Sequence, residues 1–168
     1  MKFFEVEQKY HLKRPGSIRK VLKSIGAKKI SAGTEYNEFF DKTRFLAKQK
    51  MALRLRRFGG KATLTLKGSR LKAKFTKRME IEMPIDPAIA KALLRYLGCR
   101  EIMRYSKRRE MYKTPTALIA LDFLSKFGWF LEIEASSQEI ARLARQLGLR
   151  QADREERSYL QMLFGWKH

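Results

Sequence analysis

The chain has 168 residues, of which 44% are hydrophobic, so it is long and apolar enough to bury one core. Its 38 lysine and arginine residues against 17 acidic residues give a formal charge of +21, which predicts a polyanionic partner. Nucleic acid, an anionic membrane and phosphorylated small molecules all satisfy that charge. The composition excludes a disordered chain, and the single cysteine, Cys99, excludes an internal disulfide and a thiolate zinc site.

The N-terminal segment lacks the features of an export signal. Glu5 and Glu7 stand where its apolar core would lie, and no apolar run approaches the roughly 20 residues of a membrane span. Together with the lone cysteine, this predicts a cytoplasmic protein with no membrane partner. No linker or repeat divides the sequence, so we expect one domain, residues 1–168, that acts as a monomer or a homodimer.

Extended segments dominate the chain. Alternation of apolar and polar residues predicts seven strands, at 3–12, 51–58, 62–66, 78–84, 102–112, 117–123 and 129–135. Gly59-Gly60 and the segment from Ser125 to Gly128 predict tight turns, so the strands that flank them are expected to run antiparallel. The segment from Gly68 to Lys74 is predicted to be a basic loop.

Helix signals separate some of these strands. Capping and stop residues predict four helices, near 18–25, 87–97, 136–148 and 158–164. The first is expected to begin at a Ser17 cap, the second at Asp86 followed by proline, and the third at Ser136.

Charged side chains alternate along the predicted strands. Because residues two apart in a strand share a face, Glu5, Glu7 and Lys9 project together. The same spacing recurs in Arg54 and Arg56, in Arg78, Glu80 and Glu82, in Lys107 and Arg109, and in Glu132 and Glu134, while Lys67 extends a face of threonines.

Two arrangements produce this alternation. An open sheet with one face in water is one of them. Repeated Glu-x-Glu pairs in a chain poor in acids favour the other, a closed sheet with a charged lumen. In such a lumen carboxylates would bind hard divalent cations, and arginine and lysine would bind a triphosphate.

The chain resembles the CYTH superfamily, also called triphosphate tunnel metalloenzymes, through eight short motifs in family order. They are Glu5-x-Glu7-x-Lys9, Asn37-Glu38-Phe39-Phe40-Asp41, Ala52-Leu53-Arg54-Leu55-Arg56, Leu64-Thr65-Leu66-Lys67, Arg78-x-Glu80-x-Glu82, Lys107-x-Arg109, Leu121-Asp122 and Glu132-Ile133-Glu134. Phe39 stands where the family has tyrosine. The resemblance implies an α+β fold, a closed antiparallel eight-stranded β-barrel that forms a tunnel, with flanking helices outside.

The resemblance also implies roles for individual residues. One or two Mg²⁺ or Mn²⁺ ions would be bound by Glu5, Glu7, Glu132 and Glu134, together with Asp122. The phosphates would be bound by Lys9, Arg54, Arg56, Lys67, Arg78, Lys107 and Arg109. Glu80 and Glu82 would orient these basic side chains or, as the less favoured alternative, join the metal ligands. Lys9, Glu5 and Glu7 are the candidate catalytic residues, with Lys9 first a phosphate ligand and alternatively an activator of water. Asp41 is either a turn residue or a substrate contact.

Members of the CYTH superfamily catalyse different reactions. We predict a metal-dependent phosphohydrolase that cleaves the terminal phosphate of inorganic tripolyphosphate, thiamine triphosphate or a nucleoside triphosphate, because residues 37–41 followed by Leu46 are more similar to the hydrolase members. The alternative is a class IV-type adenylate cyclase, which makes cyclic AMP and pyrophosphate from ATP. A non-catalytic module that binds RNA or another polyanion is allowed by the charge, but it has no use for paired carboxylates.

Overall fold

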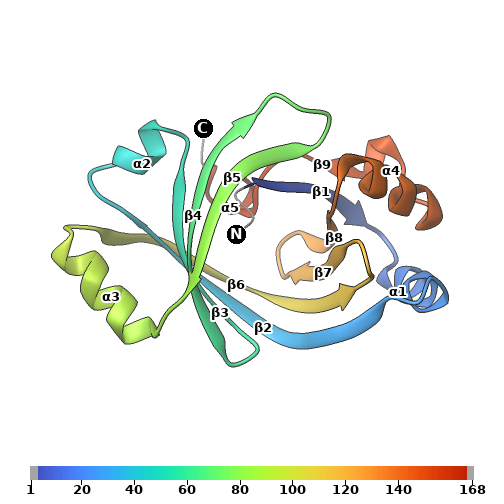
Figure 1. Cartoon of the computed structure of the whole chain (residues 1–168), viewed down its shortest axis with the longest axis horizontal. Coiled ribbons are helices and arrows are strands. Elements are labelled where there is room, and N and C mark those ends of the chain that lie inside the picture. Colours follow the sequence, from blue (N-terminus) through green and yellow to red (C-terminus); the bar gives the residue numbers. More distant parts are fainter. Residues whose placement is uncertain (1–3, 166–168) are drawn as a thin grey trace.

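In a computed structural model, which describes residues 4–165, the strands close into an antiparallel barrel (Figure 1). The barrel strands are β1 (Phe4–Leu12), β2 (Lys28–Asp41), β3 (Ala52–Phe58), β4 (Lys61–Leu71), β5 (Thr76–Pro84), β6 (Arg100–Lys113), β7 (Leu118–Leu124) and β8 (Gly128–Glu134). They follow one another in the order β1–β5–β4–β3–β2–β6–β7–β8, and β8 pairs with β1 to close the ring. A short strand, β9 (Arg154–Glu155), adds to β1. The predicted eight-stranded barrel is confirmed, and Phe3, the expected start of the first strand, lies outside the described residues.

Helices lie outside this barrel (Figure 1). They are α1 (Pro15–Ser24), α2 (Phe45–Lys48), α3 (Pro87–Tyr96), α4 (Ser137–Gln146) and α5 (Tyr159–Phe164), with a 3-10 turn, η1 (Gln151–Asp153), before β9. In Figure 1, α1 and α4 lie together at one end of the molecule, and α2 and α3 lie at the other. Within residues 4–165, no helix has the length and apolar character needed to cross a membrane.

The hydrophobic core lies between the outer face of the barrel and the helices. The larger cluster joins α1 and α4 to the outward side chains of β1, β7 and β8, and it includes Leu22, Ile119, Leu121, Leu131, Ile133, Ile140 and Leu143. A smaller cluster places Ala90 and Leu94 of α3 over Phe40 and Leu55. Since burial of apolar surface holds the helices to the outside, the inner faces of the strands are left for charged residues.

Two stretches of the sheet differ from the sequence prediction. β2, residues 28–41, is absent from the seven predicted strands, because seven of its first nine residues, 28–36, are exposed and show no apolar alternation. The predicted loop at Gly68–Lys74 is wrong for 68–71, which continue β4 past a bulge. Gly68 allows the close approach of β5 there, since an added Cβ would lie 3.3 Å from Cβ of Met79.

Helix caps agree with the sequence at two of three starts. Asp86 accepts hydrogen bonds from backbone amides of α3, and Ser136 accepts one at the start of α4, as predicted. The Ser17 cap is wrong. The helix begins at Pro15, a favourable first position because proline has no amide hydrogen to satisfy, and the Ser17 hydroxyl donates to the Arg14 carbonyl.

One ion-pair group connects α1 to the barrel. Arg19 donates two hydrogen bonds, at 2.7 and 3.2 Å, to one carboxylate oxygen of Glu110 on β6. Lys29 lies 3.1 Å from the other oxygen, which also accepts a hydrogen bond of 2.6 Å from Tyr112. The bond from Arg19, with those from Tyr112 and Lys29, lowers the pKa of Glu110 from its ordinary 4.5 to about 2, against the effect of burial.

This group predicts a pH-dependent contribution to stability. A carboxyl whose pKa is lower in the folded state stabilises the fold above its ordinary pKa of 4.5, and this contribution is lost as the pH falls towards about 2. Glu110→Gln should therefore lower the free energy of unfolding by about 1–2 kcal/mol at pH 7. Urea titrations of both proteins should show the difference shrinking below pH 4.5. A difference that stays constant down to pH 2.5 would exclude this ionic contribution.

Candidate active site

A cavity of about 760 Å³ lies within the barrel, lined by the inner faces of the strands and by the segment before α5. Its acidic lining residues are Glu5, Glu7, Glu80, Glu82, Glu132, Glu134, Glu155 and Glu156. Its basic lining residues are Lys9, Lys50, Arg54, Arg56, Lys67, Arg70, Arg78, Lys107, Arg109 and Arg157. Eight of the 17 acidic residues of the chain thus face one cavity, which rules out the open charged sheet considered from the sequence.

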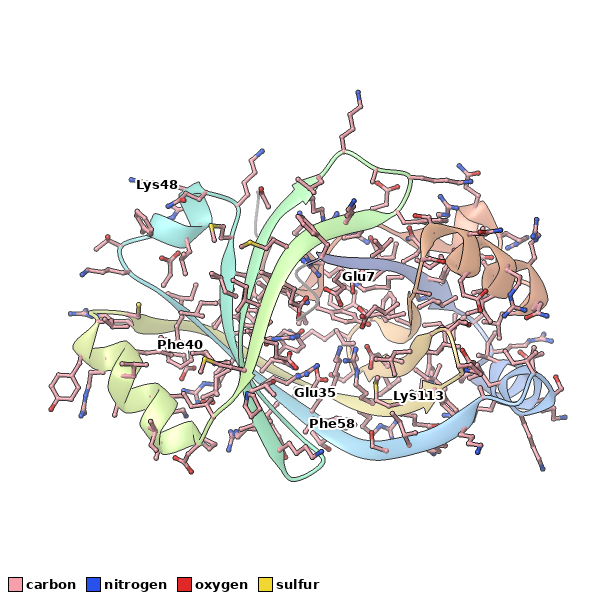
Figure 2. All side chains as sticks on the ribbon, in the orientation of Figure 1. Glu7, Glu35, Phe40, Lys48, Phe58 and Lys113 are labelled. Atoms are coloured by element: carbon pink, nitrogen blue, oxygen red, sulfur yellow. The ribbon has the colours of Figure 1, made fainter. Side chains whose placement is uncertain are left out.

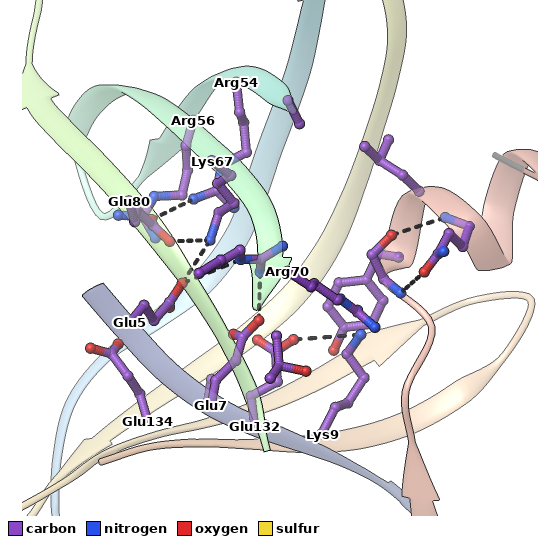
Figure 3. Close-up of a pocket in the computed structure, with 18 of the residues that line it drawn as sticks. Glu5, Glu7, Lys9, Arg54, Arg56, Lys67, Arg70, Glu80, Glu132 and Glu134 are labelled. Atoms are coloured by element: carbon purple, nitrogen blue, oxygen red, sulfur yellow. Dashed lines mark hydrogen bonds and ion pairs between the residues drawn. The ribbon is translucent and has the colours of Figure 1, made fainter. Parts of the chain in front are cut away.

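Four carboxylates gather along β1 and β8. The strand register places Glu7 directly opposite Glu134, and Lys9 opposite Glu132. Figure 3 shows these carboxylates, with Glu5, on one side of the cavity. Opposed residues of adjacent strands have Cβ atoms roughly 4.5–5.5 Å apart, so a Glu–Glu pair at this position is unfavourable without a cation between or beside it.

Lys67 of β4 connects Glu5 of β1 with Glu80 of β5. Its Nζ atom lies 3.1 Å from a carboxylate oxygen of Glu5 and also donates to Glu80, and a nitrogen of Arg54 lies 3.9 Å from Glu80. Burial, the largest effect, and a hydrogen bond with Glu80 raise the pKa of Glu5, although Lys67 opposes the rise. The two carboxyls therefore compete for the same lysine.

Two arginines have carboxylate partners of their own. Arg56 donates to Glu82 at 2.9 and 3.0 Å, and Thr65 donates to the same carboxylate at 3.0 Å. Arg78 donates to Glu7. Glu82 and Glu80 therefore contact basic side chains of β3 and β4, and their role beside a bound substrate stays a prediction.

Asp122 is fully buried at the base of the cavity wall. Its carboxylate accepts hydrogen bonds from Lys107 at 2.8 Å, from Arg109 at 2.6 and 2.7 Å, and from Tyr159 at 2.8 Å. In this arrangement Asp122 positions two of the predicted phosphate ligands and is not among the lining residues. Its implied role as a metal ligand stays a prediction.

Glu35 was missed by the sequence reasoning. It is fully buried on the inner face of β2, 3.0 Å from Arg109 and 3.4 Å from Lys107, and accepts a hydrogen bond of 2.9 Å from Asn37. Burial would raise the pKa of Glu35, but Arg109 and Lys107 hold it well below its ordinary value. Glu35-x-Asn37-x-Phe39 has the spacing of a strand face, a signal that was overlooked because 28–36 was not read as a strand.

The segment before α5 completes the site. Ser158 caps α5, and Tyr159 packs against the barrel. The Tyr159 ring also lies under two lysines, with its centroid 3.8 Å from Nζ of Lys9 and 4.2 Å from Nζ of Lys107. Lys9 donates a hydrogen bond of 2.8 Å to the carbonyl of Arg157. Burial, opposed by Glu132, lowers the pKa of Lys9 to about 8.

Asp41 has the turn role considered from the sequence. Its carboxylate accepts hydrogen bonds from the backbone amides of Lys42, Leu46 and Ala47 at 2.7–3.0 Å. It therefore holds the turn between β2 and α2, and it does not line the cavity.

The carboxylates of β1 and β8 fit a hard divalent cation by their donor chemistry. No group of three or more acidic, histidine or cysteine side chains within residues 4–165 is already gathered as a metal site. Glu5, Glu7 and Glu132 instead pair with Lys67, Arg78 and Arg109. Since Glu7 and Glu134 are register partners, Mg²⁺ or Mn²⁺ would supply the countercharge that the opposed carboxylates need.

Comparison with known proteins agrees with this geometry. The CYTH domain model matches residues 4–159. The chain belongs to the CYTH family. Adenylate cyclase CyaB of Aeromonas hydrophila is 29% identical over 93% of this chain and 86% of its own length. A Methanocaldococcus jannaschii protein with a provisional adenylate cyclase name is 30% identical over 81% of this chain and 79% of its own. A Vibrio parahaemolyticus structure with the same provisional name has a TM-score of 0.85 at 29% identity and covers 97% of this chain and 99% of its own.

The Asp122 geometry predicts a large effect on stability. Removing the charge of a buried, paired carboxylate leaves its cations uncompensated, so Asp122→Asn should lower the free energy of unfolding by about 3 kcal/mol. Glu82→Gln is the matched control and should cost less than about 1 kcal/mol, because that carboxylate is partly exposed. Denaturant titrations without divalent metal make the comparison. An Asp122→Asn protein more stable than the wild type would show that Asp122 carries unrelieved negative charge, as a spare metal ligand would.

Proposed function

We propose that this CYTH protein is a divalent-metal-dependent hydrolase of the terminal phosphate of a triphosphate. The supporting observation is that one cavity holds both kinds of charge in quantity, with carboxylates on β1 and β8 beside basic side chains on β3, β4, β5 and β6. A metal–triphosphate complex carries both kinds of charge that this cavity would bind. Inorganic tripolyphosphate, thiamine triphosphate and nucleoside triphosphates all contain that group.

The basic side chains would bind and orient the phosphates. Lys67, Arg54 and Arg56 would hold one part of the triphosphate, and Glu80 and Glu82 keep these cations in position. On the other wall Lys107 and Arg109 would hold another part, with Asp122 and Glu35 behind them, and Arg78 and Lys9 lie between the two sets.

The carboxylates of β1 and β8 that pair with basic side chains would change partners when substrate binds. Phosphate oxygens would replace Glu5, Glu7 and Glu132 beside the cations, and these three carboxylates with Glu134 would then hold Mg²⁺ or Mn²⁺. The metal ion, when bound, supplies Lewis-acid neutralisation of charge on the phosphate oxygens.

Hydrolysis requires few further groups. The oxygen of water forms a bond to the terminal phosphorus while the bond between that phosphorus and the bridging oxygen breaks. This releases orthophosphate and leaves the rest of the substrate as a diphosphate. The proton of water goes to solvent or to a basic side chain. Negative charge that develops on the bridging oxygen lies among fixed arginines and lysines, which supply most of the rate enhancement. Lys9 acts here as a phosphate ligand.

The names of the relatives favour a second candidate, adenylate cyclisation. The similarity to CyaB of Aeromonas hydrophila covers 93% of this chain. In that reaction the ribose 3′-oxygen bonds to the α-phosphorus of ATP, its proton is lost, and pyrophosphate leaves. The same cations would bind the triphosphate, with the nucleoside directed to the opposite end of the cavity.

A substrate panel separates these reactions. We expect orthophosphate release from at least one of tripolyphosphate, thiamine triphosphate, ATP and GTP, with Mg²⁺ or Mn²⁺ and not with EDTA. Ion chromatography should detect orthophosphate and a diphosphate product in equal amounts. Cyclic AMP and pyrophosphate from ATP, with no orthophosphate, would replace the hydrolase with the cyclase. No metal-dependent turnover of any substrate would contradict both.

Lys67 provides a test of the phosphate-binding wall. Lys67→Met removes one cation while keeping most of the apolar stem, so we expect about 100-fold lower kcat on the best substrate of the panel. Lys61→Met, at an exposed position of β4, is the matched control and should keep turnover within twofold. Equal kinetics of both variants would show that the Lys67 wall does not contact the substrate.

A further inference from the structure

The cavity explains little of the net charge of the chain. Its ten basic and eight acidic lining residues contribute only two of the 21 surplus positive charges. The remaining surplus lies elsewhere, and long segments have no acid at all. Residues 13–34 hold seven lysine and arginine residues and no aspartate or glutamate. A triphosphate inside the barrel does not account for this charge.

Part of the surplus lies on an open outer wall of the barrel. Between α1 and α3, no helix covers the outer side of β2 in Figure 1. The register brings the outward residues of four neighbouring strands together: Arg57 of β3, Thr34 and Tyr36 of β2, Ser106 and Arg108 of β6, and Phe123 of β7. Arg57, Tyr36, Thr34, Ser106 and Arg108 are exposed. We call these five residues, together with Phe123, the outer basic face.

Arginines and aromatic rings alternate across the outer basic face. The guanidinium of Arg57 lies 5.4 Å from the ring centroid of Tyr36, and that of Arg108 lies 4.5 Å from Phe123 and 5.9 Å from Trp129. The Tyr36 side chain is 49% exposed, so it still offers a ring surface to a partner. Flat cationic and aromatic groups side by side can hold phosphates and stack on bases.

The acids near this face are already paired. Glu38 is buried and pairs with Lys91 at 2.6 Å and, more distantly at 3.9 Å, with Arg57 of the face itself. Glu101 pairs with Arg104. Glu110 is held by Arg19 and Lys29, as described above. Exposed Lys20 and Lys23 of α1 border the face. The electrostatic field above it is therefore positive.

We propose that the outer basic face binds single-stranded nucleic acid, independently of the cavity. Its charge would hold the phosphates, and Tyr36 with the arginine planes would stack on unpaired bases. The outer wall of a barrel is convex, so a flexible strand can follow it, whereas a stiff duplex would meet only a few of its cations. Contacts to phosphates and stacking on bases tolerate any sequence, so binding would depend on salt more than on sequence.

Fluorescence anisotropy tests this proposal with a fluorescein-labelled 20-nucleotide oligouridylate that carries a 5′-hydroxyl. The wild type should bind it at 150 mM salt, more tightly than a 20-base-pair RNA duplex. Saturating tripolyphosphate with Ca²⁺ should not displace the strand, because the cavity lies on the other side of the strand wall. Displacement by tripolyphosphate would place the RNA in the cavity and overturn the proposal.

Two matched variants locate the binding surface. Arg57→Glu with Arg108→Glu should weaken binding at least tenfold and reduce the salt slope by about 1.4, at roughly 0.7 for each lost phosphate contact. Lys48→Glu with Lys72→Glu makes the same change of charge at exposed sites outside the outer basic face and should stay within twofold. Figure 2 shows Lys48 on α2. Thermal melts check that both variants are folded.

Tyr36→Ala tests stacking separately from charge and should weaken binding about tenfold. Equal losses in the two charge variants would show diffuse attraction by net charge and contradict a defined surface. Sedimentation with phosphatidylserine vesicles provides the remaining outcome. If the wild type binds vesicles but not the oligouridylate, and Arg57→Glu with Arg108→Glu abolishes that binding, the face recognises a membrane surface instead.

Discussion

The neutralisation of buried charge is the constraint on which this structure depends. A charged side chain removed from water is costly unless an opposite charge and hydrogen bonds replace its hydration. The barrel contains acids and bases in nearly equal number, and it satisfies them by pairing them with each other across the cavity. The single side chain of Arg109 contacts three carboxylates, those of Glu35, Asp122 and Glu132. The inner wall is therefore a network rather than a set of separate pairs.

This network has two classes of carboxylate. Glu35, Asp122, Glu80 and Glu82 lie behind the basic side chains and hold them in place. Glu5, Glu7 and Glu132, on β1 and β8, line the cavity and pair with Lys67, Arg78 and Arg109. We propose that the second class exchanges partners when a metal–triphosphate complex enters, so that the number of buried charges without a partner stays low. The same logic explains why the helices lie outside, since the large apolar clusters form on the outward side of the strands.

β1 gives the network its shape because it pairs with three different strands. Its first half pairs with β5, its second half with β8 on one edge and with β9 on the other. Glu5, Glu7 and Lys9 thereby meet residues from the middle of the sequence and from its C-terminal part. Closure of the barrel through β1 converts a one-strand motif into a three-dimensional site.

The motifs that alternate at spacing two were predictable, because burial of one face forces that periodicity in the sequence. Glu5, Lys67 and Glu132 were therefore placed on charged strand faces, whereas the closed barrel was expected from the resemblance to the CYTH superfamily. Glu35 was not, because the strand that carries it has exposed outward residues and so lacks an apolar pattern. The position of Tyr159 was also beyond sequence reasoning, since the path of the C-terminal segment back to Lys9 depends on tertiary packing around Phe130 and Leu124.

Isothermal titration of Mn²⁺ tests the exchange of partners most directly. In the protein alone, the carboxylates are paired with lysine and arginine, so Mn²⁺ should bind weakly. With a saturating imido analogue of tripolyphosphate, phosphate oxygens take over those cations, and Mn²⁺ should bind at least tenfold more tightly after correction for its affinity for the analogue. Equal Mn²⁺ affinities with and without the analogue would contradict the account, because they would show that the carboxylates and cations of the cavity do not neutralise each other.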